Sequence, residues 1–250
     1  MPKRLHKEFD RLKKMLLELS ALVEDVLHKS VASIERRDGT LAHEVLKDDP
    51  EIDHREVDVE EECLKILALH QPVANDLRFI VAVLKINNDL ERIGDLAVNI
   101  AERGTYLADH RSVDIPFDFY GMAEKAQSMV KRALDALIYL DAPLARQVCA
   151  ADDEVDALDR HMFETVREAM RAHPENVDEL INFLAVSRHL ERIADHATNI
   201  AEDVIYMIDG EIVRHRTDEF KPPGSREGGS GPRASIRPPQ APGQATGPEA

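Results

Sequence analysis

Acidic side chains recur at four-residue intervals in two stretches of the sequence. The first stretch places Glu91, Asp95 and Asn99 at this spacing, and a second stretch repeats the pattern. Residues four apart share one face of a helix, so each set forms a line of side-chain oxygens. Carboxylate and amide oxygens are ligands for hard cations and for iron or manganese, so the pattern predicts cation binding. The second line consists of Glu191, Asp195 and Asn199.

Two pairs of aspartates at the same spacing accompany these lines in neighbouring segments. Like charges one helical turn apart repel by roughly a few tenths of a kcal/mol on an exposed helix, and a bound cation removes that conflict. Because the set contains no thiolate, a structural zinc site of the cysteine type is excluded. We expect divalent or trivalent ions, namely Fe, Mn, Mg or Zn, on these side chains. The pairs are Asp49 with Asp53 and Asp152 with Asp156.

Other interpretations of the acidic residues stay open on the sequence alone. A Glu-x-x-x-Asp pattern in an acidic protein is commonly a solvated helix face. Arg92 and Arg192 offer neutralisation by ion pairing in a metal-free scaffold. Glu51 and His54 form the E-x-x-H spacing of di-iron bundles, which suggests a carboxylate-bridged di-metal enzyme. Such an enzyme needs a second E-x-x-H, and the helical part of the sequence offers none.

Long amphipathic helices must position these residues. Six segments are rich in Ala, Leu, Glu, Lys and Arg, and their apolar residues recur at three and four positions. We find no period-two pattern typical of a strand. Pro50 either occupies the first turn of a helix or kinks a longer one. The predicted helices cover residues near 5–36, 40–69, 73–110, 118–140, 142–172 and 175–209, with a turn at 114–116 among the breaks.

The sequence contains an internal repeat. LERIGDLAVNIAE, from Leu90 to Glu102, and LERIADHATNIAE, from Leu190 to Glu202, are identical at most positions. Each half therefore predicts three antiparallel helices joined by short connections. The predicted fold is all-α, with two tandem three-helix bundles and a C-terminal tail that we expect to be disordered because it is rich in Pro and Gly. The predicted boundaries are residues 1–112, 113–216 and 217–250.

Composition and motifs exclude several classes of function. The 250 residues carry 48 acids and 32 bases, a formal charge of −16, which argues against a nucleic-acid binder with a broad basic face. No phosphate-binding loop, dinucleotide fingerprint or nucleophile elbow is present, and neither Cys63 nor Cys149 has a neighbouring histidine, so catalysis is not expected. MPKRLHKEFDRLKK lacks the apolar run of a signal peptide, and we expect a cytoplasmic protein.

Two longer segments resemble the signatures of one family. Residues 71–102, QPVANDLRFIVAVLKINNDLERIGDLAVNIAE, resemble the first-repeat signature of the PhoU family of phosphate-regulation proteins. Residues 183–215, FLAVSRHLERIADHATNIAEDVIYMIDGEIVRH, resemble the second-repeat signature. The resemblance covers about residues 5–215, and the tail from about 217 has no counterpart in it. It implies two three-helix bundles in tandem.

The resemblance also implies a function. Members of the family are cytoplasmic, often dimeric proteins that act beside the high-affinity phosphate ABC transporter, and they meet the membrane only through their partners. They restrain phosphate uptake and the phosphate-starvation response, and relay the state of the transporter, through its ATP-binding subunit, to a sensor histidine kinase. Some carry metal ions on E(D)-x-x-x-D motifs. These motifs fall here on Asp49, Asp53, Glu91, Asp95, Asp152, Asp156, Glu191 and Asp195.

Overall fold

The computed structural model describes residues 3–110, 112–113, 117–210 and 212–213, and the predicted disordered tail, like the turn predicted at 114–116, lies outside them. Within these ranges the chain is helical and contains no strand, which confirms the predicted all-α fold. The predicted helix bounds agree with the observed ones to within two residues. The helices are α1 (Lys3–Arg36), α2 (Gly39–His70), α3 (Asn75–Asp109), α4 (Phe119–Tyr139), α5 (Ala142–Ala172) and α6 (Val177–Asp209), with a short 3-10 turn, η1 (Pro174–Asn176).

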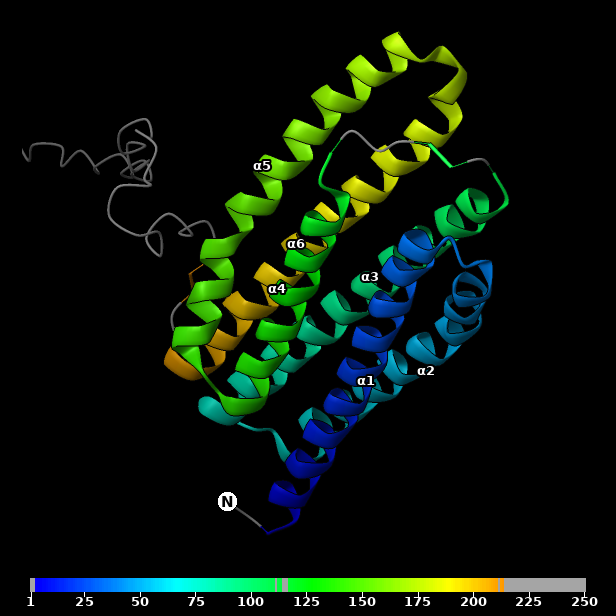
Figure 1. Ribbon diagram of the computed structural model, residues 1–250. Helices are drawn as coiled ribbons and strands as arrows, with labels where there is room; N and C mark the ends of the chain where they lie inside the picture. Colours follow the sequence, from blue (N-terminus) through cyan, green and yellow to red (C-terminus); the bar gives the residue numbers. More distant parts are fainter. Residues whose placement is uncertain (1–2, 111, 114–116, 211, 214–250) are drawn as a thin grey trace, which may run out of the picture. The chain divides into compact units, whose positions relative to one another are not determined.

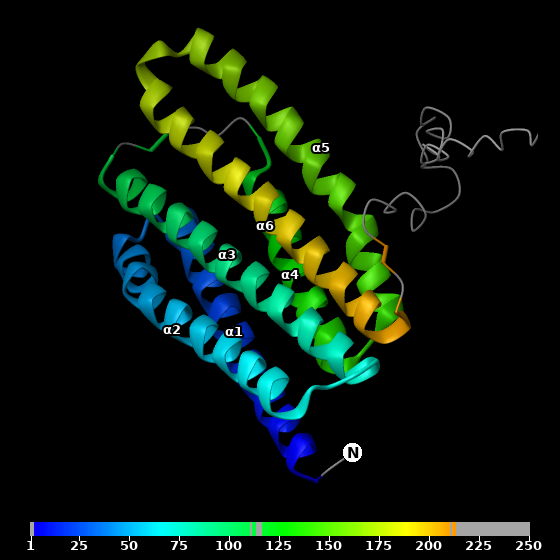
Figure 2. The same cartoon turned by 180° about the vertical axis from the view of Figure 1, so that it is seen from behind.

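The six helices pack as two trios that share one compact unit. Figure 1 shows α1 and α4 side by side on one face, and Figure 2 shows α3 and α6 side by side on the opposite face. The helices α2 and α5 lie at opposite edges, where α2 packs on α1 and α3, and α5 packs on α4 and α6. Asp95 of α3 lies close to acids of the edge helix α2, and Asp195 of α6 lies close to an acid of the edge helix α5.

Aspartate caps begin three of the helices. Asp38 accepts a hydrogen bond from the backbone N–H of Thr40 at 2.8 Å, and Asp118 and Asp141 cap α4 and α5 in the same way. A capping side chain of this kind stabilises a helix by about 1 kcal/mol because it satisfies an N–H that the helix leaves without a partner. Pro50 lies well inside α2, so it does not occupy the first turn of a helix, which was one of the two positions that the sequence allowed.

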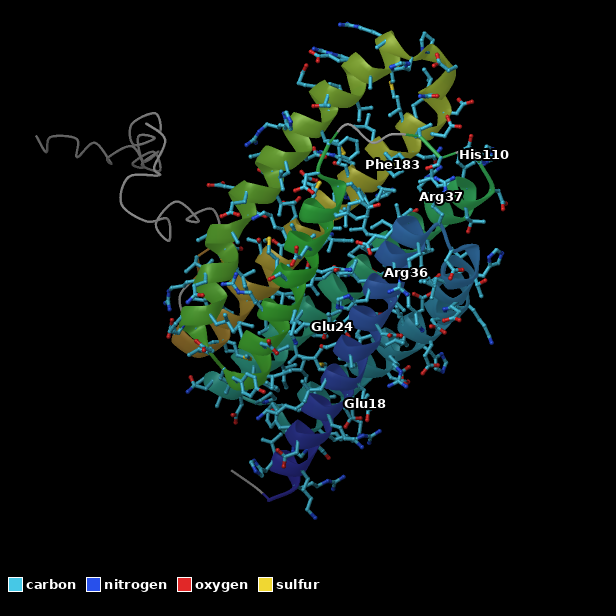
Figure 3. The ribbon with its side chains drawn as sticks, in the orientation of Figure 1. Glu18, Glu24, Arg36, Arg37, His110 and Phe183 are labelled. Atoms are coloured by element: carbon cyan, nitrogen blue, oxygen red, sulfur yellow. The ribbon has the colours of Figure 1, made fainter. Side chains whose placement is uncertain are left out.

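Side chains at the far ends of the helices tie neighbouring elements together. Arg37, which has a positive φ of 52° just after α1, donates to the backbone carbonyls of Leu107 and His110. Figure 3 shows Arg37 beside His110 at this end, where a cation also complements the negative end of the α3 dipole. Phe183 of α6 packs edge-to-face on Phe119 of α4, with ring centroids 5.9 Å apart.

A glycine allows α2 to approach α3 where the acidic residues lie. A Cβ atom at Gly94 would stand 3.1 Å from Cδ1 of the buried Ile52, closer than an ordinary contact. In the second half of the chain the corresponding residues are Ala194 and Val155, both buried. The first half therefore pairs the larger Ile52 with glycine, and the second half pairs the smaller Val155 with alanine. The summed side-chain volume of each pair is similar, as close packing requires.

None of the described helices combines the length and apolar character that a membrane span needs.

Candidate metal centres

The first acidic cluster, cluster 1, lies where α2 passes α3. Asp49 and Asp53 of α2 and Asp95 of α3 each offer one carboxylate oxygen, and the three oxygens lie within 4.8 Å of one another. Cations bind carboxylate oxygens at about 2.0–2.6 Å, so oxygens on opposite sides of one ion stand at most about 5 Å apart. The three oxygens of cluster 1 therefore fit around a single ion.

Cluster 2 occupies the matching place between α5 and α6. It consists of Asp156 of α5 with Glu191 and Asp195 of α6, again with three carboxylate oxygens within 4.8 Å of one another. Glu191 Oε2 is a buried atom with no hydrogen-bond partner, which leaves one acceptor of the cluster unsatisfied. Asp195 is exposed and the other two acids are half-buried, so the cluster opens to solvent. Its donor set, carboxylates only, suits a hard cation or iron or manganese.

Burial and mutual repulsion raise the pKa of acids in and beside cluster 1. Burial, followed by the charges of Asp53 and Asp95, raises the pKa of Asp49 above its usual range. Burial and Asp95 raise the pKa of Glu91, while Arg92 opposes this effect. A raised pKa means that the folded chain disfavours the ionised carboxylate, and a bound cation reverses that preference.

The rise in carboxyl pKa is larger beside cluster 2. Burial and the charges of Asp195 and Asp156 raise the pKa of Asp152 to about 7. Burial and the neighbouring Asp156 also raise the pKa of Asp195, against the positive charges of nearby basic side chains. Burial and Asp195 raise the pKa of Glu191. Both clusters therefore store electrostatic repulsion that positive charge relieves.

Arginines pair with both clusters, although not at equivalent positions. Arg92 lies 3.3 Å from Glu91 and 3.3 Å from Asp95, as the ion-pairing alternative suggested. Arg192, its counterpart in the repeat, makes no ion pair within the described part of the chain. Arg188 serves cluster 2 instead, at 3.1 Å from Glu191 and 3.4 Å from Asp159. These contacts are exposed and contribute little stability each.

Four predicted ligands lie outside the two triads. Glu91 and Asp152 stand beside them, near enough for cluster acids to raise their pKa. Asn99 donates its side-chain N–H to the backbone carbonyl of Asp95 at 2.8 Å, within α3. Asn199 instead reaches across to α3, where its side chain donates to Asp89 Oδ1 at 3.3 Å.

Two further acids border the clusters and were missed by the sequence analysis. Glu56 follows Asp53 by three residues, and Asp159 follows Asp156 by three, so each lies on the same helix face as its cluster. Burial, followed by the charges of Glu60 and Asp53, raises the pKa of Glu56. Asp159 accepts a hydrogen bond from Ser187 at 2.7 Å. Their matching places in the repeat are the signal that identifies them.

The E-x-x-H alternative gains no support from the geometry. Glu51 and His54 are both exposed, and Glu51 pairs with Arg55 on the same helix at 2.7 Å. Neither residue belongs to a cluster of metal-ligating side chains within the described residues.

The metal-free chain is expected to lose stability as the pH rises through the range set by Asp152. The usual pKa of this carboxyl is 3.8 and its folded pKa is about 7, so between these values the folded chain holds a proton that the unfolded chain releases. The free energy of unfolding therefore falls with rising pH, and the loss is complete above about pH 7. Asp152→Asn removes this term and gains about 1 kcal/mol at pH 8, after solvent screening is allowed for.

Urea unfolding in EDTA at pH 5 and pH 8 measures this effect. The variant Glu164→Gln, at an exposed acid outside both clusters, serves as the control, and its difference from the parent should be similar at both pH values. An Asp152→Asn variant with no gain at pH 8 relative to pH 5 would contradict the assignment.

Comparisons with known proteins agree with the repeat. The family model described as "PhoU domain" matches residues 16–104 and 119–204. The chain is 38% identical over 213 residues to the phosphate-specific transport system accessory protein PhoU homolog of Aquifex aeolicus, across 85% of this chain and 96% of that protein. It is 35% identical to the homolog of Clostridium acetobutylicum, across 82% and 94% of the two chains. The crystal structure of PhoU from Pseudomonas aeruginosa superposes with a TM-score of 0.80 at 36% identity, covering 82% of this chain and 99% of that one.

Proposed function

The chain belongs to the PhoU family, and from this premise we propose that it is an accessory regulator of a phosphate-specific transport system. The observation that carries the proposal is the family match in both halves, together with relatives named as accessory proteins of that system. In this role the chain restrains phosphate uptake and the phosphate-starvation response. It acts in the cytoplasm as an adaptor between the ATP-binding subunit of the transporter and a sensor histidine kinase.

The adaptor role, as opposed to an enzymatic one, is supported by the direction in which the acidic residues face. Asp53 and Asp195 are exposed, and the remaining cluster acids are half-buried at helix seams. A di-metal enzyme places its ligands inside the bundle, where substrate can be enclosed. Six long helices offer large outer surfaces to protein partners instead, and we propose that the chain acts on them as a homodimer.

We also propose that clusters 1 and 2 each bind a metal ion, of Fe, Mn, Mg or Zn. The support is the close approach of three carboxylate oxygens at each cluster and the raised pKa of Asp49, Glu191 and Asp195. A bound ion would replace repulsion by attraction and hold α2 against α3, and α5 against α6. The surfaces presented to partners would then depend on metal occupancy.

A metal-free scaffold is the second candidate, and one observation favours it. Arg92 and Arg188 already contact acids of both clusters at 3.1–3.3 Å. If these ion pairs are the only counterions, neutralising the clusters leaves the regulatory function intact.

Complementation of a deletion strain tests the function. Deleting the gene is expected to switch on a phosphate-starvation reporter in high phosphate, and the intact chain should restore repression. Unchanged reporter activity after deletion would contradict the regulatory role.

The same strain separates the two candidates. If metal is needed, the double variant Asp95→Ala/Asp195→Ala fails to restore repression although it accumulates to normal levels. The control Glu164→Gln, an exposed acid that pairs with Arg167 on its own helix, should restore repression. Full repression by the double variant would favour the metal-free scaffold.

A further inference from the structure

Two buried nitrogen atoms at one end of the α3–α6 contact have no hydrogen-bond partner among the residues that the structure describes. They are Nε of Arg103 on α3 and Nδ1 of His189 on α6, and both side chains are half-buried. Buried polar atoms in folded proteins are nearly always hydrogen-bonded, and an unpaired buried N–H of a charged group is costly. The Nε–H of Arg103 therefore lacks an acceptor, and Nδ1 of His189 lacks a partner that its tautomer could match.

The other end of the same helix pair shows how such groups are normally satisfied. Lys85 Nζ of α3 lies 2.8 Å from Asp203 Oδ1 of α6. Asp89 Oδ1 of α3 lies 2.7 Å from His196 Nδ1 of α6 and also accepts the side-chain N–H of Asn199. Lys85 and His196 therefore each meet a carboxylate on the opposite helix.

The internal repeat relates the two ends. The contacts of Lys85 with Asp203 and of Asp89 with His196 show that α3 and α6 run antiparallel, since the number rises on one helix as it falls on the other. The repeat at an interval of 100 residues places His189 at the position of Asp89, and Arg103 at the position of Asp203. Both carboxylates of the balanced end are thus replaced by basic groups at the other end.

A third basic side chain, Arg192, lies on the same helix as His189. Arg192 is exposed and makes no ion pair with any residue that the structure describes. Burial, followed by the positive charges of Arg192 and Arg103, lowers the pKa of His189, so both arginines lie within electrostatic reach of His189. Arg192 also acts electrostatically on Asp195, three residues further along α6, so it lies between His189 and cluster 2.

We propose that Arg103, His189 and Arg192 bind a tetrahedral oxyanion with the chemistry of phosphate, as free inorganic phosphate or as a phosphomonoester. Guanidinium groups donate paired, charge-assisted hydrogen bonds to phosphate oxygens, and a buried Nε is one of the donors that such binding uses. The oxyanion supplies the negative charge that Asp89 and Asp203 supply at the balanced end. Arg192 borders cluster 2, so the test below is run without metal, and the inference does not rest on the proposed function.

Calorimetric titration of the full chain with inorganic phosphate, and separately with glycerol 3-phosphate, tests the proposal. EDTA is present throughout, so that no phosphate binds through a metal ion on the carboxylates. The parent chain should bind at one saturable site, and Arg103→Gln should weaken the affinity by at least about tenfold. Arg92→Gln, the counterpart of Arg192 in the first half, should change the affinity by less than about twofold, because Arg92 is occupied by Glu91 and Asp95.

The two probes distinguish the sources of the ligand. Binding of both indicates a general phosphate site, and binding of one alone identifies the free anion or the ester. If Arg103→Gln does not fold by circular dichroism, the exposed Arg192→Gln replaces it, and the same loss of affinity is expected. Absence of saturable binding of either probe, or unchanged affinity in the folded variants, would overturn the proposal.

Discussion

Adding manganese(II) to the metal-free protein is expected to raise its free energy of unfolding by about 5 kcal/mol when the ion is present at one hundred times its dissociation constant. Each independent site that exists only in the folded chain contributes about 2.7 kcal/mol under these conditions, and we propose two such sites. The sites exist only in the folded chain because each brings carboxylates from two helices within 4.8 Å. Urea unfolding with and without the ion measures the gain.

The variants Asp95→Asn and Asp195→Asn should each remove about half of this stabilisation, since each disables one cluster. In EDTA the same variants should be at least as stable as the parent, because each removes one of three mutually repelling charges. Glu164→Gln, which lies outside both clusters, should retain the full gain. An equal gain in the parent and in the double variant would show that the ion stabilises the chain elsewhere.

Replacing Asp203 by alanine is expected to lower the free energy of unfolding by about 3 kcal/mol. The side chain of Asp203 is 4% exposed and lies 2.8 Å from Lys85 across the α3–α6 contact, whereas Lys85 is 36% exposed. Removing one member of a buried ion pair leaves the other without its counterion, and this loss is the main cost. The partial exposure of Lys85 allows some rehydration, so the loss falls at the lower end of the range for buried pairs.

A surface ion pair between α5 and α6 provides the matched control. Asp209 pairs with Arg146 at 2.6 Å, with both side chains about one-third exposed, and Asp209→Ala should cost less than about 1 kcal/mol. Both variants are measured by urea unfolding in EDTA. Equal losses for Asp203→Ala and Asp209→Ala would contradict the view that the α3–α6 contact joins the two trios through a buried charge pair.

The bounds of the helices could be predicted because the sequence features that set them are local. Apolar residues recur at helical spacing, and Asp38 and Asp141 cap helices that begin beside predicted turns. The i, i+4 spacing of Glu191 and Asp195 placed both acids on one face of α6, where the structure has them. The repeat then indicated which aspartate pair accompanies each line, because the same residue types recur at the same place in both halves.

Contacts between helices could not be predicted in the same way. The sequence suggested Arg192 as the counterion of the second acidic line, but Arg188 takes that place because it lies one turn before Glu191 and beside Asp159 on α5. Glu102 and Glu202 occupy equivalent positions in the repeat, yet Glu102 is exposed and Glu202 is buried. Such differences depend on which face of α6 packs on α5, and the spacing of residues in one segment does not encode it.

Elemental analysis of the chain, purified without chelator, tests the central claim most directly. We expect about one metal ion per cluster. Asp95→Ala and Asp195→Ala should each lose one ion, and Glu51→Gln/His54→Ala should keep both because these exposed residues lie outside the clusters. Metal content that is unchanged in the Asp95→Ala/Asp195→Ala double variant would contradict the claim that the two carboxylate clusters hold the ions.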